Sequence, residues 1–243
     1  MNILVTGGSR GIGAGISEAL IKAGARVAVH YRTTKDTAET LVKGHNAQAF
    51  QADLASPEGC SKLFEQVLAA FGHLDVLVNN AGIALHAPIQ EPEAEWLAKW
   101  EDTMAVNLTA TALLSRKAIR HYQEREGGRI IHISSRAAFR GDTPEYLAYA
   151  ASKAGIVALH RSIARGFGKQ GIKSFLIAPG FVRTDMAQEF IDTYGEAHAI
   201  SDLALDTLTE PADLAPTVVL LASGLADHAT GSTIDINAGS YVH

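Results

Sequence analysis

Cysteine is nearly absent from this sequence, since Cys60 is the only one among 243 residues. A single cysteine cannot form an intramolecular disulfide or a cysteine-rich metal site, so we expect neither, and we expect no metal cofactor. Cys60 shares a helical spacing with Phe64, Val67 and Phe71. That pattern predicts a small buried core residue rather than a reactive thiol.

Long apolar runs and basic clusters are also missing. No apolar stretch approaches the roughly 20 residues of a membrane span, and the chain reaches a predicted strand at Ile3, which leaves no room for a signal peptide. The net charge is −5 and the isoelectric point is about 6.0. Neither nucleic acid nor a membrane is therefore expected as a partner, and a cytoplasmic protein is favoured.

Strand and helix patterns alternate along the whole chain. The predicted strands are residues 3–5, 26–31, 47–52, 74–78, 129–134, 173–178 and 233–236, and the clearest predicted helices are 57–71, 93–126, 144–169 and 211–223. Parallel strands need helical crossovers, so the pattern predicts an α/β fold. We expect one Rossmann-like domain over residues 1–243, a doubly wound parallel sheet of about seven strands that binds ligands beyond their carboxyl ends.

One stretch departs from this alternation. Residues 187–210 follow a predicted strand end and mix apolar side chains with acidic ones. Such a long connection at the ligand-binding edge predicts a mobile lid over the substrate.

A glycine-rich turn joins the first predicted strand to the first predicted helix. Residues 6–13 read Thr-Gly-Gly-Ser-Arg-Gly-Ile-Gly, a spacing that differs from the usual Gly-x-Gly-x-x-Gly dinucleotide motif. Glycines let backbone N–H groups approach a pyrophosphate, and the helix N-terminus adds a partial positive charge. The turn therefore predicts a nucleotide site at Gly7, Gly11 and Gly13, the alternative being a tight turn without a ligand.

The end of the second predicted strand bears on the choice of cofactor. An NAD-preferring enzyme usually has a carboxylate there for the ribose 2′-hydroxyl. This chain has no acid at that point and reads His30-Tyr31-Arg32-Thr33-Thr34. Arg32 and Arg10 could converge on a 2′-phosphate, so NADP(H) is predicted. The alternative is that both arginines are solvated surface charges.

Tyr149 and Lys153 are four residues apart in the predicted helix 144–169, which puts them on one helical face. A phenol has an ordinary pKa of about 10, and a neighbouring ammonium stabilises the phenolate, so the pair suits proton transfer. Tyr31 and Lys35 have the same spacing, but they run from a strand into a turn. Position therefore favours Tyr149 and Lys153.

Two serines end the strand that precedes this helix. Side chains alternate in an extended chain, so only one of Ser134 and Ser135 can point at the phenol, and we favour Ser135. The alternative is that Ser135 only ends the strand as a turn residue.

Asn107 lies in the middle of a predicted helix, where asparagine is locally unfavourable. The position indicates a kink or a bound water, and an interhelical hydrogen bond is the alternative.

In this order the motifs resemble the short-chain dehydrogenase/reductase family over nearly the whole chain. The resemblance rests on the glycine turn 6–13, Asp53-Leu54, Asn79-Asn80-Ala81-Gly82, Asn107, Ser135, Tyr149 with Lys153, and Pro179-Gly180-Phe181-Val182-Arg183-Thr184. The segment from Ser134 to Gly155 is most similar to the β-ketoacyl carrier-protein reductase branch.

The resemblance implies a four-residue catalytic set. Tyr149 would be the general acid in ketone reduction, Ser135 would bond the substrate carbonyl, and Lys153 would hold the cofactor ribose. Asn107 would fix a water that feeds protons toward Lys153. The residues expected to bind the cofactor are Gly7, Ser9, Arg10, Gly11, Ile12, Gly13, Arg32, Asp53, Leu54, Asn80, Ala81, Gly82, Tyr149, Lys153, Pro179, Gly180, Val182 and Thr184.

The resemblance also implies a substrate and partners. It indicates an NADPH-dependent reductase of a 3-oxoacyl thioester, a homotetramer, and an acyl carrier protein as a further partner. Arg129 matches one basic carrier-docking position, whereas Gln170 replaces the second and Ala238 stands where a glycine is usual. Another small carbonyl or alcohol (a sugar, a polyketide or a xenobiotic ketone) therefore stays open as the substrate. A nonenzymatic NADP sensor is the remote alternative.

Overall fold

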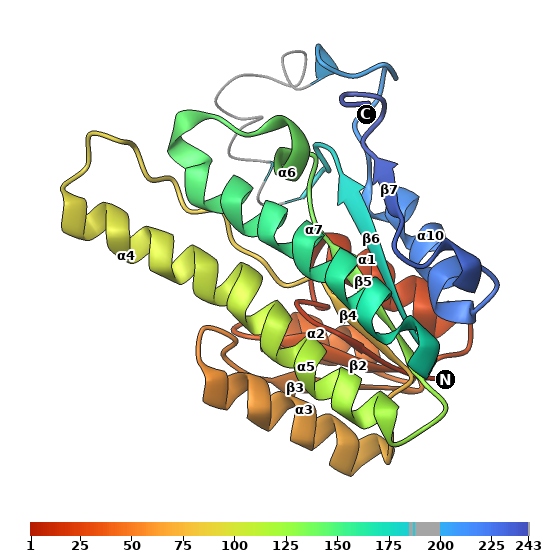
Figure 1. Ribbon diagram of the computed structural model, residues 1–243. Coiled ribbons are helices and arrows are strands. Elements are labelled where there is room, and N and C mark those ends of the chain that lie inside the picture. The colour runs from red at the N-terminus through yellow and green to blue at the C-terminus, as the bar shows by residue number, and fades with distance from the viewer. Residues whose placement is uncertain (185–186, 188–199, 243) are drawn as a thin grey trace.

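The computed structural model describes residues 1–184, 187 and 200–242. It contains a parallel sheet of seven strands in the order β3-β2-β1-β4-β5-β6-β7. The strands are β1 (Asn2–Val5), β2 (Arg26–Tyr31), β3 (Ala47–Gln51), β4 (Val76–Asn79), β5 (Gly128–Ile133), β6 (Ile172–Pro179) and β7 (Thr233–Ile236). The predicted doubly wound α/β fold is confirmed, and the strand order reverses between β1 and β4 (Figure 1).

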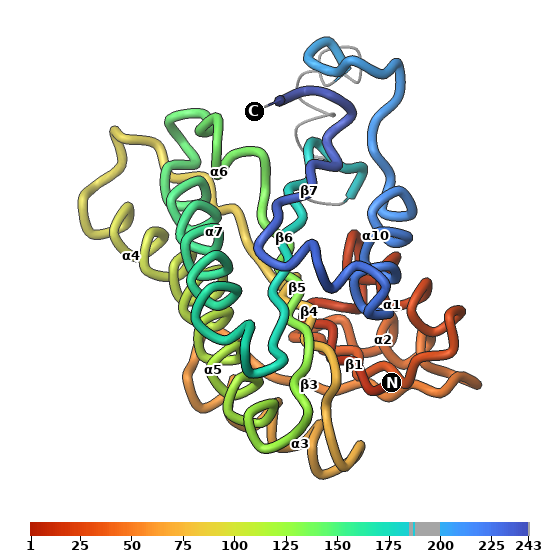
Figure 2. Tube along the Cα trace, turned by 45° about the vertical axis from the view of Figure 1, so that its right-hand side comes forward, coloured from red at the N-terminus to blue at the C-terminus, as the bar shows by residue number. Residues whose placement is uncertain are grey.

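Helices cover both faces of the sheet (Figures 1 and 2). One face carries α1 (Gly11–Lys22), α2 (Lys35–Val42) and α10 (Pro211–Ser223). The other carries α3 (Pro57–Phe71), α5 (Ala110–Gln123) and α7 (Leu147–Phe167), and α4 (Glu93–Met104) leads into α5 from beyond the sheet. Among the helices of the described ranges, none combines the length and apolar character needed to cross a membrane.

Strand β4 shows why the middle of the sheet is apolar on both sides. Val76, Leu77 and Val78 are all 0% exposed. Alternate side chains of a strand point to opposite faces. Leu77 accordingly joins the cluster under α3 and α5, while Val76 and Val78 join the cluster under α1 and α10.

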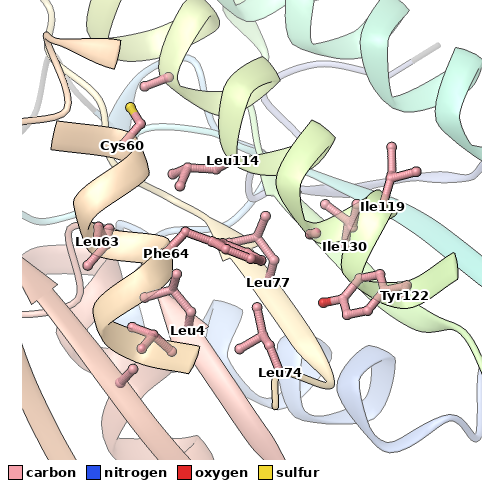
Figure 3. Packing of buried hydrophobic residues seen from close by; sticks show 14 of the residues in the cluster. Leu4, Cys60, Leu63, Phe64, Leu74, Leu77, Leu114, Ile119, Tyr122 and Ile130 are labelled. Atoms are coloured by element: carbon pink, nitrogen blue, oxygen red, sulfur yellow. The ribbon is translucent and has the colours of Figure 1, made fainter. Parts of the chain in front are cut away.

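The cluster under α3 and α5 contains the single cysteine (Figure 3). There Leu4 and Leu77 from the sheet lie against Phe64 of α3, one helical turn after Cys60. Cys60 is 0% exposed, and burial raises the pKa of its thiol to about 11. Its predicted place in the core is confirmed.

Two predicted helices are less regular than their patterns indicated. The predicted helix 93–126 is α4 and α5 joined by a π-helical turn at Ala105–Thr109. The predicted helix 144–169 opens with a 3₁₀ turn at Pro144–Tyr146 before α7 begins. A π turn widens the backbone helix locally, and here it lies around Asn107, where the sequence indicated an irregularity.

Half of the predicted lid, residues 187–210, falls outside what the structure describes, because residues 188–199 are not among the described residues. At its far end Thr209 forms a parallel bridge with Val182. That bridge keeps the end of the segment beside the carboxyl end of β6. The covering role of the segment stays a prediction.

Candidate active site

The glycine turn after β1 is too tightly packed for side chains. Gly7 and Gly11 have φ angles of 59° and 52°, which glycine adopts readily. A Cβ atom on Gly13 would lie 2.0 Å from the Gly7 carbonyl oxygen. No side chain caps the N-terminus of α1, so its first-turn N–H groups lack a side-chain acceptor. The turn therefore fits an anionic pyrophosphate at the start of the helix.

His30 fixes this turn from β2. Its Nδ1 accepts from the Gly7 amide at 2.9 Å and its Nε2 lies 3.2 Å from the Ala52 carbonyl oxygen. Its own carbonyl accepts from the Gly8 amide at 2.8 Å. Only the neutral tautomer protonated on Nε2 satisfies both ring bonds, and burial lowers the pKa of His30 to about 4. Sequence reasoning missed this residue, although a histidine in an apolar strand beside the turn was the available signal.

Thr6 and Asn80 join the glycine turn to the end of β4. Thr6 Oγ1 accepts from the amides of Asn80 and Ala81 at 2.9 and 3.0 Å. Asn80 Nδ2 donates to the carbonyls of Thr6 and Gly7 at 2.9 and 3.0 Å. The predicted residues Asn80 and Ala81 thus lie against the glycine turn, at the point where the strand order reverses.

The residues predicted for the adenosine end lie around the start of α2 and the end of β3. Ser9 Oγ is 2.7 Å from Thr34 Oγ1, which ties the glycine turn to α2. Arg10 and Arg32 are both exposed, as is Asp53, whose carboxylate accepts from a local amide at 3.0 Å. Exposure suits both a phosphate partner and solvated charges, the two alternatives weighed for the arginines.

The side chains of Ile12 and Leu54 pack in the hydrophobic core. Ile12 packs against the cluster under α1, and Leu54 is buried in the cluster under α3. If these two residues contact a cofactor as predicted, they do so through their backbone atoms.

The chain after β6 returns to the glycine turn. Pro179 ends β6, and a Cβ on Gly180 would lie 2.7 Å from the backbone that follows β7. Val182 is buried at 4% exposure, and the Thr184 methyl group would lie 3.2 Å from a Cβ on Gly11. The segment predicted to meet the nicotinamide therefore lies against the N-terminus of α1.

Ser134 and Ser135 make different contacts after β5, as strand alternation predicts. Ser134 Oγ donates to the Lys153 carbonyl at 3.0 Å and so anchors α7 to the strand. Ser135 Oγ accepts from the Ala137 amide at 3.1 Å, and its hydroxyl is close enough to the Tyr149 phenol to lower the pKa of that phenol. Ser135 is thus both a turn residue and the neighbour of Tyr149.

Burial dominates the acidity of the phenol. It raises the pKa of Tyr149, the hydrogen bond with Ser135 opposes the shift, and the charge of Asp142 adds to it. Lys153 Nζ lies 5.6 Å from the centroid of the Tyr149 ring and donates to the Ile133 carbonyl at 3.0 Å, and burial lowers the pKa of Lys153 to about 8. The Lys153 charge is not among the causes of this shift, since the amine faces the ring and a carbonyl, and the lowering of the phenol pKa by Lys153 stays a prediction.

Asn107, in the π turn, clamps the chain that follows β4. Its Oδ1 accepts from the Ile83 amide at 2.8 Å, and its Nδ2 donates to the Ile83 carbonyl at 2.9 Å and to Ser152 Oγ at 3.0 Å. A Cβ on Gly82 would lie 3.4 Å from both Asn107 Oδ1 and Lys153 Nζ. The amide therefore shapes the site through protein contacts, and its water-holding role stays a prediction.

Arg129, the matched carrier-docking residue, lies at the amino end of β5. Its Nε and Nη2 donate to the two carboxylate oxygens of Asp227, both at 2.8 Å, and Lys173 lies 3.5 Å from the same carboxylate. A strand rises roughly 3.3 Å per residue, so Arg129 and Ser135 are roughly 20 Å apart. Arg129 therefore forms its ion pair with Asp227 at the edge of the sheet opposite to Ser135, and its carrier-docking role stays a prediction.

Comparisons with known proteins cover nearly the whole chain. The family model described as Enoyl-(Acyl carrier protein) reductase matches residues 7–241. The 3-oxoacyl-[acyl-carrier-protein] reductase FabG of Staphylococcus aureus (strain Mu50 / ATCC 700699) is 36% identical, over 98% of this chain and 97% of the relative. The FabG reductase of Vibrio cholerae serotype O1 is 33% identical, over 98% and 96%.

A solved structure gives the same picture for the fold. The dehydrogenase/reductase from Sinorhizobium meliloti 1021 superposes with a TM-score of 0.89 and is 34% identical. The match covers 99% of this chain and 95% of the other.

Proposed function

The chain belongs to the short-chain dehydrogenase/reductase family, and on that premise we propose that it is an NADPH-dependent reductase of a 3-oxoacyl thioester. It is an oxidoreductase acting on CH–OH and C=O groups, with a nicotinamide cofactor. The observation that carries the proposal is the meeting of Ser135 and Tyr149 at the edge where the glycine turn lies, close enough for the serine hydroxyl to lower the pKa of the phenol against the effect of burial. The thioester is proposed because the curated relatives are named 3-oxoacyl-[acyl-carrier-protein] reductases.

The residues present fit a nicotinamide dinucleotide. The glycine turn is a cradle that a Cβ would fill, and the N-terminus of α1 would take the pyrophosphate. When bound, the cofactor supplies the hydride that reduces the carbonyl carbon. The residues that would border it are Gly7, Gly11 and Gly13 at the pyrophosphate, Asp53 and Asn80 to Gly82 at the adenosine, and Val182 and Thr184 at the nicotinamide amide.

In the proposed mechanism, Tyr149 gives its phenolic proton to the carbonyl oxygen as that oxygen becomes an alcohol. The raised pKa of Tyr149 keeps the phenol protonated at neutral pH, as this direction requires. Ser135 Oγ already accepts from the Ala137 amide, so the hydroxyl keeps its proton to donate, and with substrate bound it would turn from the Tyr149 phenol to the same carbonyl oxygen. Lys153, which is buried beside Tyr149, would bond the cofactor ribose, and Asn107 would support it from the π turn.

NADPH rather than NADH is proposed because β2 ends without an acid and with the exposed Arg32. The variant Arg32→Ala is expected to raise KM for NADPH about tenfold, the scale of a charge-assisted bond to a phosphate, and to leave KM for NADH unchanged. Lys35→Ala, which removes a neighbouring exposed charge, is the control. A wild-type preference for NADH of about tenfold or more would contradict the cofactor proposal.

The substrate is tested by following NADPH absorbance with the purified protein and acetoacetyl thioesters, beside a panel of simple ketones and sugars. Thioester-dependent oxidation of NADPH is expected, and Tyr149→Phe is expected to lower its kcat/KM by about 10³. Tight NADPH binding without turnover on any carbonyl would contradict the enzyme and favour a nonenzymatic NADP sensor.

A second candidate substrate is another small carbonyl compound not carried on a protein. This candidate is favoured because neither carrier-docking position offers a free basic side chain. Arg129 is paired with Asp227, and Gln170 accepts a hydrogen bond from Gln123 at 2.7 Å. Equal kcat/KM for a carrier-bound thioester and a short free thioester would indicate that no acyl carrier protein docks.

We also propose that the protein is a cytoplasmic homotetramer, built on α4, α5, α7 and β7. Leu97 of α4 and Leu147 of α7 are exposed at 45% and 42%, which gives these helices apolar surface for pairing. Light scattering after size-exclusion chromatography tests the assembly, and a monomer would contradict it.

A further inference from the structure

Two arginines follow the serine of the site. Arg136 comes directly after Ser135, and Arg140 ends the short helix α6 (Ala137–Arg140), so the two are four residues apart and project from one helical face. Arg136 Nη1 donates to Asp202 Oδ2 at 3.0 Å, and Arg140 Nη1 donates to the same oxygen. A single carboxylate oxygen thus receives both guanidinium groups.

This cluster lies at the carboxyl edge of the sheet. In Figure 1, α6 is at the end toward which the β6 arrow points. The Arg136 amide donates to the carbonyl of Pro179, which ends β6, at 2.9 Å. The amide of Ala204, two residues after Asp202, donates to the Ala238 carbonyl at 2.8 Å, beyond the end of β7. The ion pairs therefore stand where the substrate of a doubly wound fold is bound.

A neighbouring carboxylate links the cluster to the proposed general acid. Asp142, just after α6, contributes to the charge felt by Arg136 and by the phenol of Tyr149. Both groups therefore lie within the range of one carboxylate. A charge bound by the arginines would stand close to the carbonyl that Tyr149 protonates.

The arginines have capacity for a further anion. The side chain of Arg136 is 18% exposed, against 41% for Arg140 and 52% for Asp202. Burial and the charge of Arg140 lower the pKa of Arg136, as expected for two like charges held together in a partly desolvated place. Each guanidinium has five N–H donors, of which Asp202 engages one nitrogen per arginine. A carboxylate could join Asp202 or exchange with it.

We propose that Arg136 and Arg140 form an anion-binding side of the substrate site, and that the preferred substrate carries a carboxylate a few bonds from its reducible carbonyl. This inference rests on the proposed carbonyl reduction at Ser135 and Tyr149. The phosphate of a pantetheine arm fits less well, because the arm separates it from the thioester, whereas Arg136 adjoins Ser135. Two sources share the required chemistry: a free oxo acid, and a 3-oxoacyl thioester whose acyl chain ends in a carboxylate.

Matched substrate pairs separate these sources. The first pairs are 3-oxobutanoate, 4-oxopentanoate and 5-oxohexanoate, each against its ethyl ester, which keeps the ketone and removes the charge. The second pair is the N-acetylcysteamine thioester of 3-oxohexanedioic acid against that of 3-oxohexanoic acid. The wild-type protein is expected to favour the charged member of at least one pair by about tenfold in kcat/KM, with an optimum in chain length.

The variants then assign the preference to the arginines. Arg136→Met is expected to lower kcat/KM for the charged member about tenfold and to leave its neutral partner within about twofold. Asp202→Asn, which removes the competing carboxylate, is expected to strengthen the preference. Arg120→Met changes an exposed arginine in the last turn of α5 and is the control. An unchanged preference in Arg136→Met would mean that the ion pair only ties α6 to the chain at Asp202, and would overturn the inference.

A binding measurement keeps the inference testable without turnover. Calorimetric titration of 3-oxobutanoate and of the 3-oxohexanedioic thioester into protein saturated with NADP⁺ is expected to show binding of at least one, weakened about tenfold in Arg136→Met. Absence of binding by both in the wild type would overturn the anion site. Carboxylate binding without reduction of any carbonyl would instead contradict the proposed function and leave the anion site standing, so the two failures are distinguishable.

Discussion

The imidazole of His30 accepts a hydrogen bond from the Gly7 amide at 2.9 Å, and its other nitrogen lies 3.2 Å from the carbonyl of Ala52. One buried side chain on β2 therefore sets the spacing between the glycine turn and the chain that leads to Asp53. These are the two segments that would hold the pyrophosphate and the adenine. The bond depends on a neutral ring, which burial maintains by lowering the pKa of His30 to about 4.

Replacing His30 is expected to weaken cofactor binding more than catalysis. His30→Ala removes both ring bonds, and a total loss of about 1.4 kcal/mol of binding free energy, the scale of one net hydrogen bond, corresponds to roughly tenfold in Kd for NADPH. At saturating NADPH, kcat is expected to stay within about twofold, since no reacting group is touched. His30→Asn keeps an acceptor near Gly7 and is expected to recover part of the affinity.

Fluorescence titration of NADPH checks this expectation. His45→Ala changes an exposed histidine after α2 and is the control. An unchanged Kd in His30→Ala would mean that the backbone alone holds the turn.

Tyr149→Phe is expected to lower kcat/KM by about 10³, within the range for loss of a general acid. Tyr146→Phe is the matched control, since Tyr146 precedes α7 in a 3₁₀ turn and packs at 6.0 Å against the His86 ring. It has Ala150 where a lysine partner would stand. Steady-state kinetics on any accepted ketone decides the matter, and similar losses in the two variants would contradict the role given to Tyr149.

Ser135→Ala is expected to affect catalysis, whereas Ser134→Ala is expected to affect mainly stability. Ser135→Ala removes the hydroxyl beside Tyr149 and should lower kcat about 10²-fold. Ser134→Ala removes the bond to the Lys153 carbonyl and should cost about 1 kcal/mol of stability, with a smaller effect on kcat. Urea unfolding and kinetics are measured on both. A larger fall in kcat for Ser134→Ala would reverse the assignment.

Acid is expected to destabilise the fold through its buried histidines. Burial lowers the pKa of His30 to about 4 and that of His132, beside His160 in the core, to about 3. The unfolded chain takes up protons below about pH 6.5, which the folded chain does not, so stability is full above that pH and falls below it. The loss continues down to the folded pKa values and amounts to roughly 2 kcal/mol per histidine at pH 5.

Urea unfolding at pH 7.5 and pH 5 measures this loss. His132→Asn is expected to lower stability at both values but to reduce the difference between them by about 2 kcal/mol. His45→Asn should leave that difference as in the wild type. A difference unchanged by His132→Asn would show that other groups govern the acid sensitivity.

Much of the fold could be predicted from local pattern. The apolar run of β4 indicates a strand covered on both faces. The glycine turn at residues 6–13 indicates a tight turn, because only glycine fits its backbone angles and close contacts. The predicted ends of the strands differ from the observed ends by one or two residues. The end of a strand depends on where its hydrogen-bonded neighbour ends, which local sequence does not show. The short helix α6 was missed because four residues carry too little periodicity to show.

The site divides in the same way. Residue types and chain order indicated Ser135 and Tyr149, which the structure brings together, and strand alternation indicated that only one of Ser134 and Ser135 could face the phenol. The partners of buried or charged groups were not accessible from spacing. Arg129 and Asp227, 98 positions apart, meet only because β5 and the chain before β7 are brought to one edge.

By itself the sequence determined the α/β class, the glycine turn and the types of residue available at the edge of the sheet, because these follow from local sterics and periodicity. Only the tertiary structure decided that His30 holds the turn, that burial dominates the pKa of the Tyr149 phenol, and that Arg136 is paired with Asp202, 66 positions further along the chain. Burial, desolvation and charge pairing depend on which distant segments pack together. No short stretch of sequence contains that information.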